Sequence, residues 1–178
     1  MKLSKLSNNL RFMLIKMSYK TKSPHLASSL SCIDIVGTLY QSVLKINKNN
    51  LKSSCRNRFI LSKGHAATSL YVALEYKKII SRKELNSYTK KGSLLEEHPS
   101  PKLSGVEAAT GSLGHGLSIG CGLALSSKII KKKFMTYVLI SDGECNEGSV
   151  WEAALFASAK KLNNLCAFID YNKWQATG

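Results

Sequence analysis

The chain has 178 residues, 44% of them hydrophobic and 21% charged, which is typical of one globular domain with a sizeable core. No apolar run approaches the ~20 residues that a membrane-spanning helix needs, so we expect no membrane partner. The formal net charge of +15 comes mostly from lysines spread along the whole chain. We interpret it as a solvated surface rather than a nucleic-acid groove, which would also show interleaved aromatic and arginine side chains.

The N-terminal region is basic, because its first 33 residues carry six Lys or Arg and no acid. Transit peptides share this composition, but apolar residues at helical spacing favour an ordinary helix over residues 4–19. Residues 31–34 are similar to a capping box and predict the start, or an early turn, of a second helix. The five cysteines form no C-x-x-C pair, which is typical of reduced thiols. We therefore expect a cytoplasmic protein without a zinc site.

The middle of the chain alternates polar and apolar segments. We expect a polar loop over residues 46–57, then a short buried strand over 58–61 and a helix that ends near Tyr76. Residues 81–84 have the pattern of a capping box for another short helix. Residues 91–110 lack periodicity and contain two prolines, which predicts a long surface loop of the kind that often has a function.

The last third of the chain predicts two helices and two strands. A glycine-rich stretch leads into a small-residue helix that ends near Ser127. The apolar run 134–140 is of the kind that is buried on both faces of a sheet. Residues 149–152 are similar to a capping box for a helix to about Leu162. Residues 165–170 predict another buried strand.

Helices that alternate with short apolar strands indicate an α/β fold, in three layers, with a mostly parallel sheet flanked by helices. We see no internal repeat and no interior linker, so residues 1–178 are predicted to form one domain. The last predicted strand lies close to Gly178, and no further element follows it to close the sheet. We therefore expect this domain to be incomplete, or truncated, at its C-terminal end.

Two oxygen-bearing side chains follow successive predicted strands. Asp142 comes just after one strand, and Asn172, 30 residues later, comes just after the next. A right-handed crossover brings both strand ends to the same edge of the sheet, where open α/β sheets bind ligands. A carboxylate and an amide oxygen suit Mg²⁺, which usually shares its ligands with phosphate oxygens. Gly143 would let a phosphate approach the backbone without a side chain in the way.

The dipeptide Asp142-Gly143 is by itself a common turn sequence, and a simple turn is the alternative interpretation. The paired Asn172 and the strand context favour the metal site. Residues 142–148, followed by 170–172, moreover resemble the thiamine-diphosphate motif, although Ser141 replaces the motif's first glycine. This resemblance implies Mg²⁺ bound by the side chains of Asp142 and Asn172 and by the main-chain carbonyl of Trp174.

Three histidines lie in segments that resemble those of transketolases, in the same order along the chain. His25 follows a Ser-Pro pair, His65 ends a Leu-Ser-Lys-Gly-His run, and His98 precedes a Thr-Gly-Ser-Leu-Gly-His-Gly loop. The resemblance extends from about residue 6 to Gly178. It implies that His65 contacts the cofactor diphosphate. It also implies that His25 and His98 face the substrate, where imidazoles donate to hydroxyls and move protons near neutral pH.

The same resemblance assigns two further parts of the site. Gly111, Ser112 and Leu113 would pass close to the cofactor's central rings, where bulk is excluded. Glu147 matches an acid that in the family lies near the dimer interface and links the two active sites. From local sequence alone, close helix packing for the glycines and a helix N-terminal carboxylate for Glu147 are equally open.

The resemblance implies transfer of a two-carbon ketol unit between sugar phosphates, with thiamine diphosphate as electron sink. The carboxylate that activates the cofactor's pyrimidine ring belongs, in the family, to another domain, and we find none here. Residues 144–153 look most like the N-terminal subunit of split transketolases. We therefore expect a C-terminal subunit that carries the pyrimidine-binding domain, in a homodimer or a dimer of heterodimers, and no activity from this chain alone.

Several alternatives are compatible with parts of this pattern. The α subunit of a 2-oxo-acid dehydrogenase has a similar Asp-Gly…Asn-Glu-Gly run, but His25 and the segment that ends at His65 argue against it. Deoxyxylulose-phosphate synthase has a first histidine motif that also continues into small residues. An inactive, truncated subunit that only packs against a partner, and an RNA-binding basic protein, are the alternatives from other classes.

Overall fold

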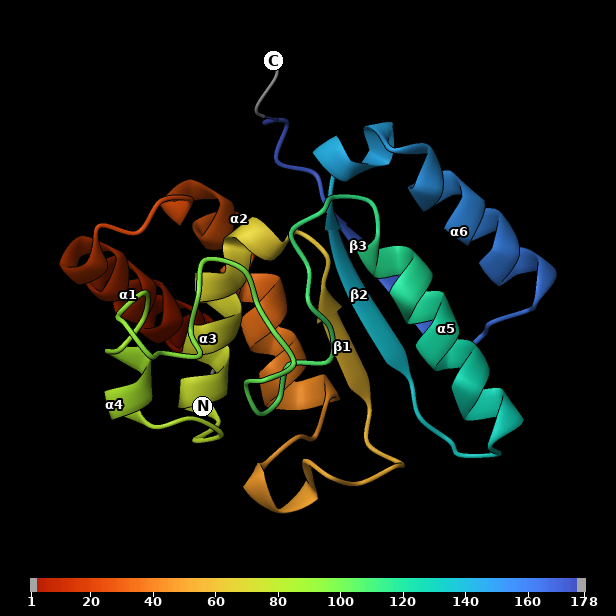
Figure 1. The fold of residues 1–178 in the computed structure, drawn as a ribbon, viewed down its shortest axis with the longest axis horizontal. Helices are drawn as coiled ribbons and strands as arrows, with labels where there is room; N and C mark the ends of the chain where they lie inside the picture. Colours follow the sequence, from red (N-terminus) through yellow and green to blue (C-terminus); the bar gives the residue numbers. More distant parts are fainter. Residues whose placement is uncertain (1–2, 176–178) are drawn as a thin grey trace.

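The computed structural model describes residues 3–175, in which a parallel sheet lies between two sets of helices (Figure 1). The helices are α1 (Leu3–Thr21), α2 (Leu26–Thr38), α3 (Ala67–Tyr76), α4 (Arg82–Leu85), α5 (Gly116–Ile129) and α6 (Gly148–Ala159). The strands are β1 (Arg58–Leu61), β2 (Thr136–Ser141) and β3 (Leu165–Asp170). A π-helical turn over Leu39–Val43 extends α2.

The strands are ordered β1-β2-β3, and both neighbouring pairs are parallel. Alternate side chains of a strand point to opposite faces of a sheet, which here divides the apolar residues between two cores. Figure 1 shows α1, α2 and α3 on one side of the sheet and α5 and α6 on the other. The predicted α/β fold, with three layers and a parallel sheet, is therefore confirmed.

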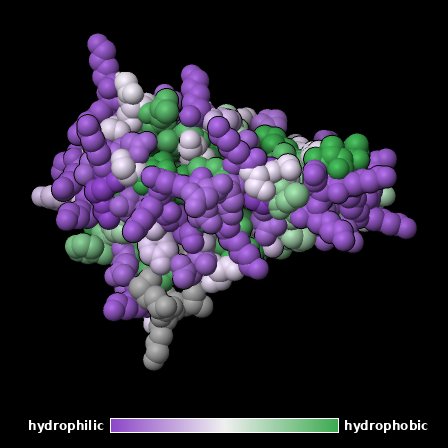
Figure 2. Space-filling view, turned by 90° about the horizontal axis from the view of Figure 1, so that it is seen from below, coloured by the Kyte–Doolittle hydropathy of each residue, from purple (hydrophilic) through white to green (hydrophobic). Residues whose placement is uncertain are grey.

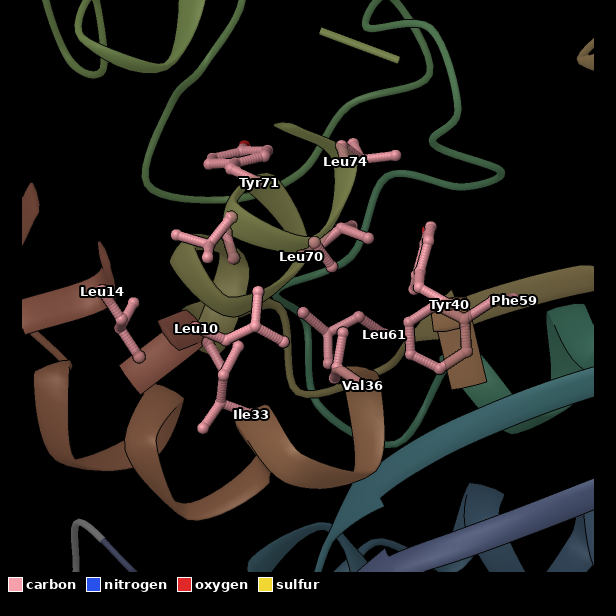
Figure 3. Packing of buried hydrophobic residues seen from close by; sticks show 14 of the residues in the cluster. Leu10, Leu14, Ile33, Val36, Tyr40, Phe59, Leu61, Leu70, Tyr71 and Leu74 are labelled. Carbon is pink, nitrogen blue, oxygen red and sulfur yellow. The ribbon is translucent and has the colours of Figure 1, made fainter. Parts of the chain in front are cut away.

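The larger core joins α1, α2 and α3 to one face of the sheet. Phe59 and Leu61 of β1 pack in one cluster with Val36, Tyr40 and Leu70 (Figure 3). The apolar stripe of α1 is buried against the same cluster and consists of Leu6, Leu10, Leu14 and Met17. Each such side chain contributes roughly 1.5–3 kcal/mol when it is fully buried, which explains why the N-terminal segment folds as an ordinary helix.

The smaller core lies on the opposite face, between the sheet and helices α5 and α6. It contains Ile60, Val138 and Ile140 from the strands, together with Leu117 and Ala124 from α5. β2 is therefore buried on both faces, as its continuous apolar run predicts.

The prediction that the last strand is buried is wrong for the part of the chain that the structure describes. β3 pairs only with β2 among residues 3–175 and forms an edge of the sheet. Ala167 is exposed, and 52% of the surface of Ile169 is accessible. An apolar run predicts a strand, but it does not specify how many neighbours the strand has.

Helices α2 and α6 form, and residues 31–34 lie early in α2 as predicted, but neither apparent capping box caps its helix. α2 begins at Leu26, and the Ser31 hydroxyl donates to the carboxylate of Asp170 instead of capping a helix. α6 begins at Gly148 with Glu147 in the N-cap position, and it ends at Ala159, before the predicted end near Leu162. The Ser149 hydroxyl likewise donates to the carbonyl of Gly114, and the local pattern reveals neither of these partners.

The remaining elements agree closely with the sequence. β1 and β3 have the predicted bounds, and Ser81 and Glu84 form the expected capping box at the start of α4. The segment 91–110 contains neither helix nor strand. Within the described residues, no helix is long and apolar enough to cross a membrane. Figure 2 shows hydrophilic side chains over most of the face seen from below, in keeping with a solvated lysine-rich surface.

Candidate active site at the carboxyl ends of the strands

Asp142 and Asn172 lie at the same edge of the sheet. Parallel pairing puts Ser141 of β2 beside Asp170 of β3, so the residues that follow the two strands are neighbours. Asp142 Oδ2 accepts a hydrogen bond of 2.7 Å from the backbone N–H of Lys173, which ties this carboxylate to the residue after Asn172. Asp142 and Asn172 are thus neighbours at the carboxyl ends of β2 and β3, where α/β sheets bind ligands.

The side-chain oxygens of Asp142 and Asn172 have acceptor capacity that their protein hydrogen bonds do not use, and this capacity could bind a hard cation. Asp142 accepts two backbone N–H groups, from Gly143 and Lys173, whereas a carboxylate offers about four acceptor sites. Asn172 Oδ1 accepts only the Trp174 N–H, at 2.9 Å, among the contacts that the structure gives it. Residues 3–175 contain no cluster of three His, Cys, Asp or Glu side chains that could hold a metal. A cation here would rely on carboxylate, amide and main-chain oxygens, which is the donor set that Mg²⁺ prefers.

A buried ion pair between Lys63 and Asp170, which the sequence did not suggest, lies next to Asn172. The side chain of Lys63 has no accessible surface, and its Nζ lies 2.5 Å from Asp170 Oδ2. The same carboxylate oxygen accepts from the Ser31 hydroxyl and, at 3.4 Å, from Asn172 Nδ2. The only sequence signal was a lysine placed between an apolar strand and a buried helix, where a solvated side chain does not fit.

Two of the predicted histidines lie close together. The rings of His25 and His65 are in edge contact, with centroids 5.5 Å apart. Burial, followed by the positive charge of Lys63 and the nearby His25 and His98, lowers the pKa of His65 to about 4. His65 is therefore a neutral imidazole near pH 7, able to donate one hydrogen bond without carrying charge.

The third histidine contacts the glycine-rich loop. Gly111 has φ +141°, and a Cβ atom at this position would lie 2.5 Å from His98 Cδ2. The backbone of the loop and the imidazole ring are thus in contact only because position 111 has no side chain. Ser112 and Leu113, the other two loop residues predicted to approach the cofactor, are exposed to solvent on the surface of the loop.

Glu144 is a second buried charged group whose role the sequence did not predict. Its side chain lies two residues after Asp142, is fully buried, and accepts hydrogen bonds from Ser62, Gly114 and Ser141. These partners belong to the end of β1, the glycine-rich loop and the end of β2. An acid within a turn is normally solvated, so a partner 82 residues away in the chain had no local signal.

Glu147 and Trp174 stand at the rim of this region. Glu147 is exposed at the N-cap of α6 without a side-chain capping bond. Its Cβ lies 2.7 Å from the position that a Cβ on Gly114 would occupy, so it borders the glycine-rich loop. The side chain of Trp174 is 83% accessible, and the structure gives its carbonyl oxygen no protein partner among the described residues.

Comparison with known proteins identifies the family to which this chain belongs. Residues 3–178 match the family model described as transketolase, thiamine diphosphate binding domain. The chain belongs to the transketolase family. This finding agrees with the motif resemblance, and it identifies the domain as one that binds thiamine diphosphate.

The similarity extends to single subunits of split transketolases. The chain is 42% identical over 165 residues to a subunit of the apulose-4-phosphate transketolase of Phocaeicola vulgatus, covering 93% of this chain and 59% of the relative. It is 36% identical over 173 residues to a 6-deoxy-6-sulfo-D-fructose transketolase subunit of a Clostridium species, covering 97% and 63%. The chain thus spans about three fifths of the length of these transketolase subunits.

Solved transketolases share the fold as well as the sequence pattern. The structure of transketolase from Campylobacter jejuni superimposes with a TM-score of 0.92 at 31% sequence identity. The match covers 99% of this chain and 29% of the Campylobacter enzyme. The parallel sheet and the layers of helices described above are therefore those of the N-terminal part of a transketolase.

Proposed function

We propose that this chain binds thiamine diphosphate and Mg²⁺ at the carboxyl edge of its sheet and forms the N-terminal part of a transketolase. The reaction would transfer a two-carbon ketol unit between sugar phosphates. The observation that carries the proposal is that Asp142 and Asn172 lie next to each other at the carboxyl edge of the sheet. The backbone N–H of Lys173, the residue after Asn172, donates to the carboxylate of Asp142. A carboxylate and an amide oxygen in this place suit a cation that holds a diphosphate.

The metal ligands would be Asp142, Asn172 and the main-chain carbonyl of Trp174. The Asn172 amide is held with Nδ2 toward Asp170 and Ser31, which leaves Oδ1 for the cation. Gly143 fits a diphosphate because its backbone has no side chain there. Residues 1–178 would form the diphosphate-binding domain.

The three histidines would act on the diphosphate and the substrate. His65, neutral near pH 7 because its pKa is lowered to about 4, can donate to a diphosphate oxygen without forming an ion pair. His25 and His98 are exposed and lie close enough to His65 to lower its pKa, so they can reach substrate hydroxyls and move protons. When bound, thiamine diphosphate supplies the electron sink for cleavage of the carbon–carbon bond.

The active enzyme would need a second polypeptide. Two relatives are named as single subunits of transketolases, which supports a partner that carries the pyrimidine-binding domain. Candidate residues such as His25, His98 and Glu147 are solvent-exposed here, so the chain offers one wall of a site rather than a closed pocket. We propose a homodimer or a dimer of heterodimers, with Glu147 near the contact between two active sites.

Calorimetric titration with thiamine diphosphate tests the binding part of the proposal. Wild type is expected to bind only when Mg²⁺ is present, and Asp142→Asn is expected to lose about tenfold or more in affinity because a charged ligand is removed. Asp34→Asn is the matched control, since Asp34 pairs with Arg11 on the surface of α1 and α2 and is not among the proposed ligands. Binding that is independent of Mg²⁺, or an Asp142→Asn affinity equal to that of the control, would refute the metal site.

Product analysis tests the reaction. The chain is combined with the candidate C-terminal partner and supplied with a ketose phosphate donor and an aldose phosphate acceptor, or with pyruvate. Ketol transfer from the ketose phosphate is expected. Turnover of pyruvate instead would indicate a deoxyxylulose-phosphate synthase or a 2-oxo-acid dehydrogenase, and no turnover with bound cofactor would indicate an inactive subunit.

A further inference from the structure

Glu144 connects three segments that surround the proposed cofactor site. Its Oε1 atom accepts from the Ser62 hydroxyl and, at 3.0 Å, from the Gly114 N–H. Its Oε2 atom accepts from the Ser141 N–H at 2.8 Å and from the Ser141 hydroxyl at 3.3 Å. The Ser62 hydroxyl in turn accepts from the Gly116 N–H at 3.1 Å, which is the first N–H of α5.

Only a carboxylate satisfies this arrangement. Each carboxylate oxygen of Glu144 accepts a different backbone N–H, one from Gly114 and one from Ser141. A glutamine of the same shape has one oxygen and one NH₂ group, so in either orientation its NH₂ would face a backbone N–H. Because Glu144 is fully buried, water does not replace the lost bond.

The two amides that depend on this network belong to the glycine-rich loop. Gly114 is bound directly by Glu144, and Gly116 is bound through Ser62. Glu144 itself lies in the short helical turn Gly143–Asn146, and Asp142 is the N-cap residue of this turn. One buried side chain therefore connects the turn that would hold the metal to the loop that would border the cofactor's central rings.

We propose that Glu144 is a positioning residue that couples the metal-binding turn to the glycine-rich loop of residues 111–116. Occupation of the diphosphate site would order the loop through this carboxylate, although Glu144 does not contact the cofactor. The coupling rests on the proposed function, whereas the attachment of the loop by Glu144 can be measured without any cofactor.

Backbone hydrogen exchange of the free chain, followed by NMR, tests the attachment. In Glu144→Gln, the backbone amide that faces the NH₂ group, Gly114 or Ser141, is expected to exchange on the order of tenfold faster than in wild type, because its buried bond to the carboxylate is lost. Glu152→Gln is the matched control, since Glu152 is exposed on α6. Exchange within twofold of wild type at both Gly114 and Ser141, or the same acceleration in the control, would overturn the proposal.

A second variant keeps the test valid if Glu144→Gln does not fold. Ser62→Ala retains the buried carboxylate and the Cβ atom against Gly116, but it removes the hydroxyl that accepts the Gly116 N–H. Faster exchange is expected at Gly116, with Gly114 less affected because it binds Glu144 directly. Unchanged exchange at Gly116 would overturn the role of the network.

Inorganic pyrophosphate with Mg²⁺ tests the coupling, because it has the diphosphate of the cofactor without the central rings that the loop would border. In wild type it is expected to slow exchange at residues 142–144, at Gly114 and at Gly116, and in Ser62→Ala the effect on Gly116 is expected to disappear. Protection of residues 142–144 without any change in the loop would overturn the coupling and leave the proposed function intact. Failure of wild type to bind either pyrophosphate or thiamine diphosphate, also when the candidate C-terminal partner is present, would overturn the proposed function, and the coupling with it.

Discussion

Lys63 and Asp170 form a buried ion pair across the sheet, with Nζ 2.5 Å from Oδ2 and side-chain accessibilities of 0% and 8%. Lys63 follows β1, and Asp170 ends β3, so the pair spans the central strand at its carboxyl end. Asp170 also accepts from Ser31 and Asn172. The pair therefore joins the core to the residues proposed to bind the metal.

Replacing Lys63 with methionine tests this pair. The variant leaves Asp170 buried without its cation, and the free energy of unfolding is expected to fall by about 3–5 kcal/mol, as for other buried pairs that lose one partner. Urea denaturation measures the change. Lys52→Met, at an exposed turn position, is the control and is expected to stay within about 0.5 kcal/mol of wild type. A Lys63→Met variant as stable as this control would contradict the structural role of the pair.

The orientation of the Asn172 amide gives a second prediction. The Ser31 hydroxyl accepts from Asn172 Nδ2 at 3.3 Å and donates to Asp170, so it would help to keep Oδ1 directed to the proposed metal position. Ser31→Ala is expected to raise the Mg²⁺ concentration for half-maximal thiamine diphosphate binding about tenfold, as for other groups that orient metal ligands. Ser126→Ala, within α5, is the control. An unchanged Mg²⁺ requirement in Ser31→Ala would show that the amide needs no such support.

The framework of the site could be predicted from the sequence because it depends on patterns that are local. β1 and β3 are short apolar runs with polar flanks, and their bounds were predicted correctly. Once two successive strands are parallel, the handedness of the crossover brings Asp142 and Asn172 to one edge. Nothing beyond the order of elements was needed for this step.

The side chains that contact Asp170 beside the site could not be predicted, because their partner is distant in the sequence. Lys63 binds a carboxylate 107 residues away, and Ser31 binds the same group 139 residues away. Ser31 and Asp34 have the spacing of a capping box, yet α2 begins earlier, after His25 in a left-handed conformation with φ 61°. That start has no side-chain capping bond, so it leaves no signature in the sequence.

The lowered pKa of His65 predicts a pH dependence of stability. The unfolded imidazole has a pKa of about 6.5, whereas the folded one has a pKa of about 4, mainly because of burial. Between these values the unfolded state binds a proton that the folded state does not, so the contribution of His65 to stability is lost as pH falls from about 6.5 toward 4.

Comparison of variants separates the contribution of His65 to the pH dependence of stability from that of the other titratable groups. In urea denaturation at pH 4.5 and pH 7.5, His65→Gln is expected to lose less stability on acidification than wild type. His115→Gln, at an exposed position before α5, is expected to keep the wild-type difference. If wild type and His65→Gln lose the same stability on acidification, the pKa of His65 is not lowered in the folded state.

A pair of glycine variants tests whether the loop must pass against His98. Gly111→Ala places a methyl group 2.5 Å from the His98 ring at φ +141°, where L residues are strained. We expect a loss of roughly 1–3 kcal/mol in the free energy of unfolding and weaker thiamine diphosphate binding. Gly122→Ala is the matched control, because a Cβ there meets no atom within 4 Å and lies inside α5. It is expected to be neutral, or to stabilise by up to about 1 kcal/mol through helix propensity. Urea denaturation and calorimetric titration of both variants give the comparison, and equal effects of the two substitutions would exclude a close contact between loop and imidazole.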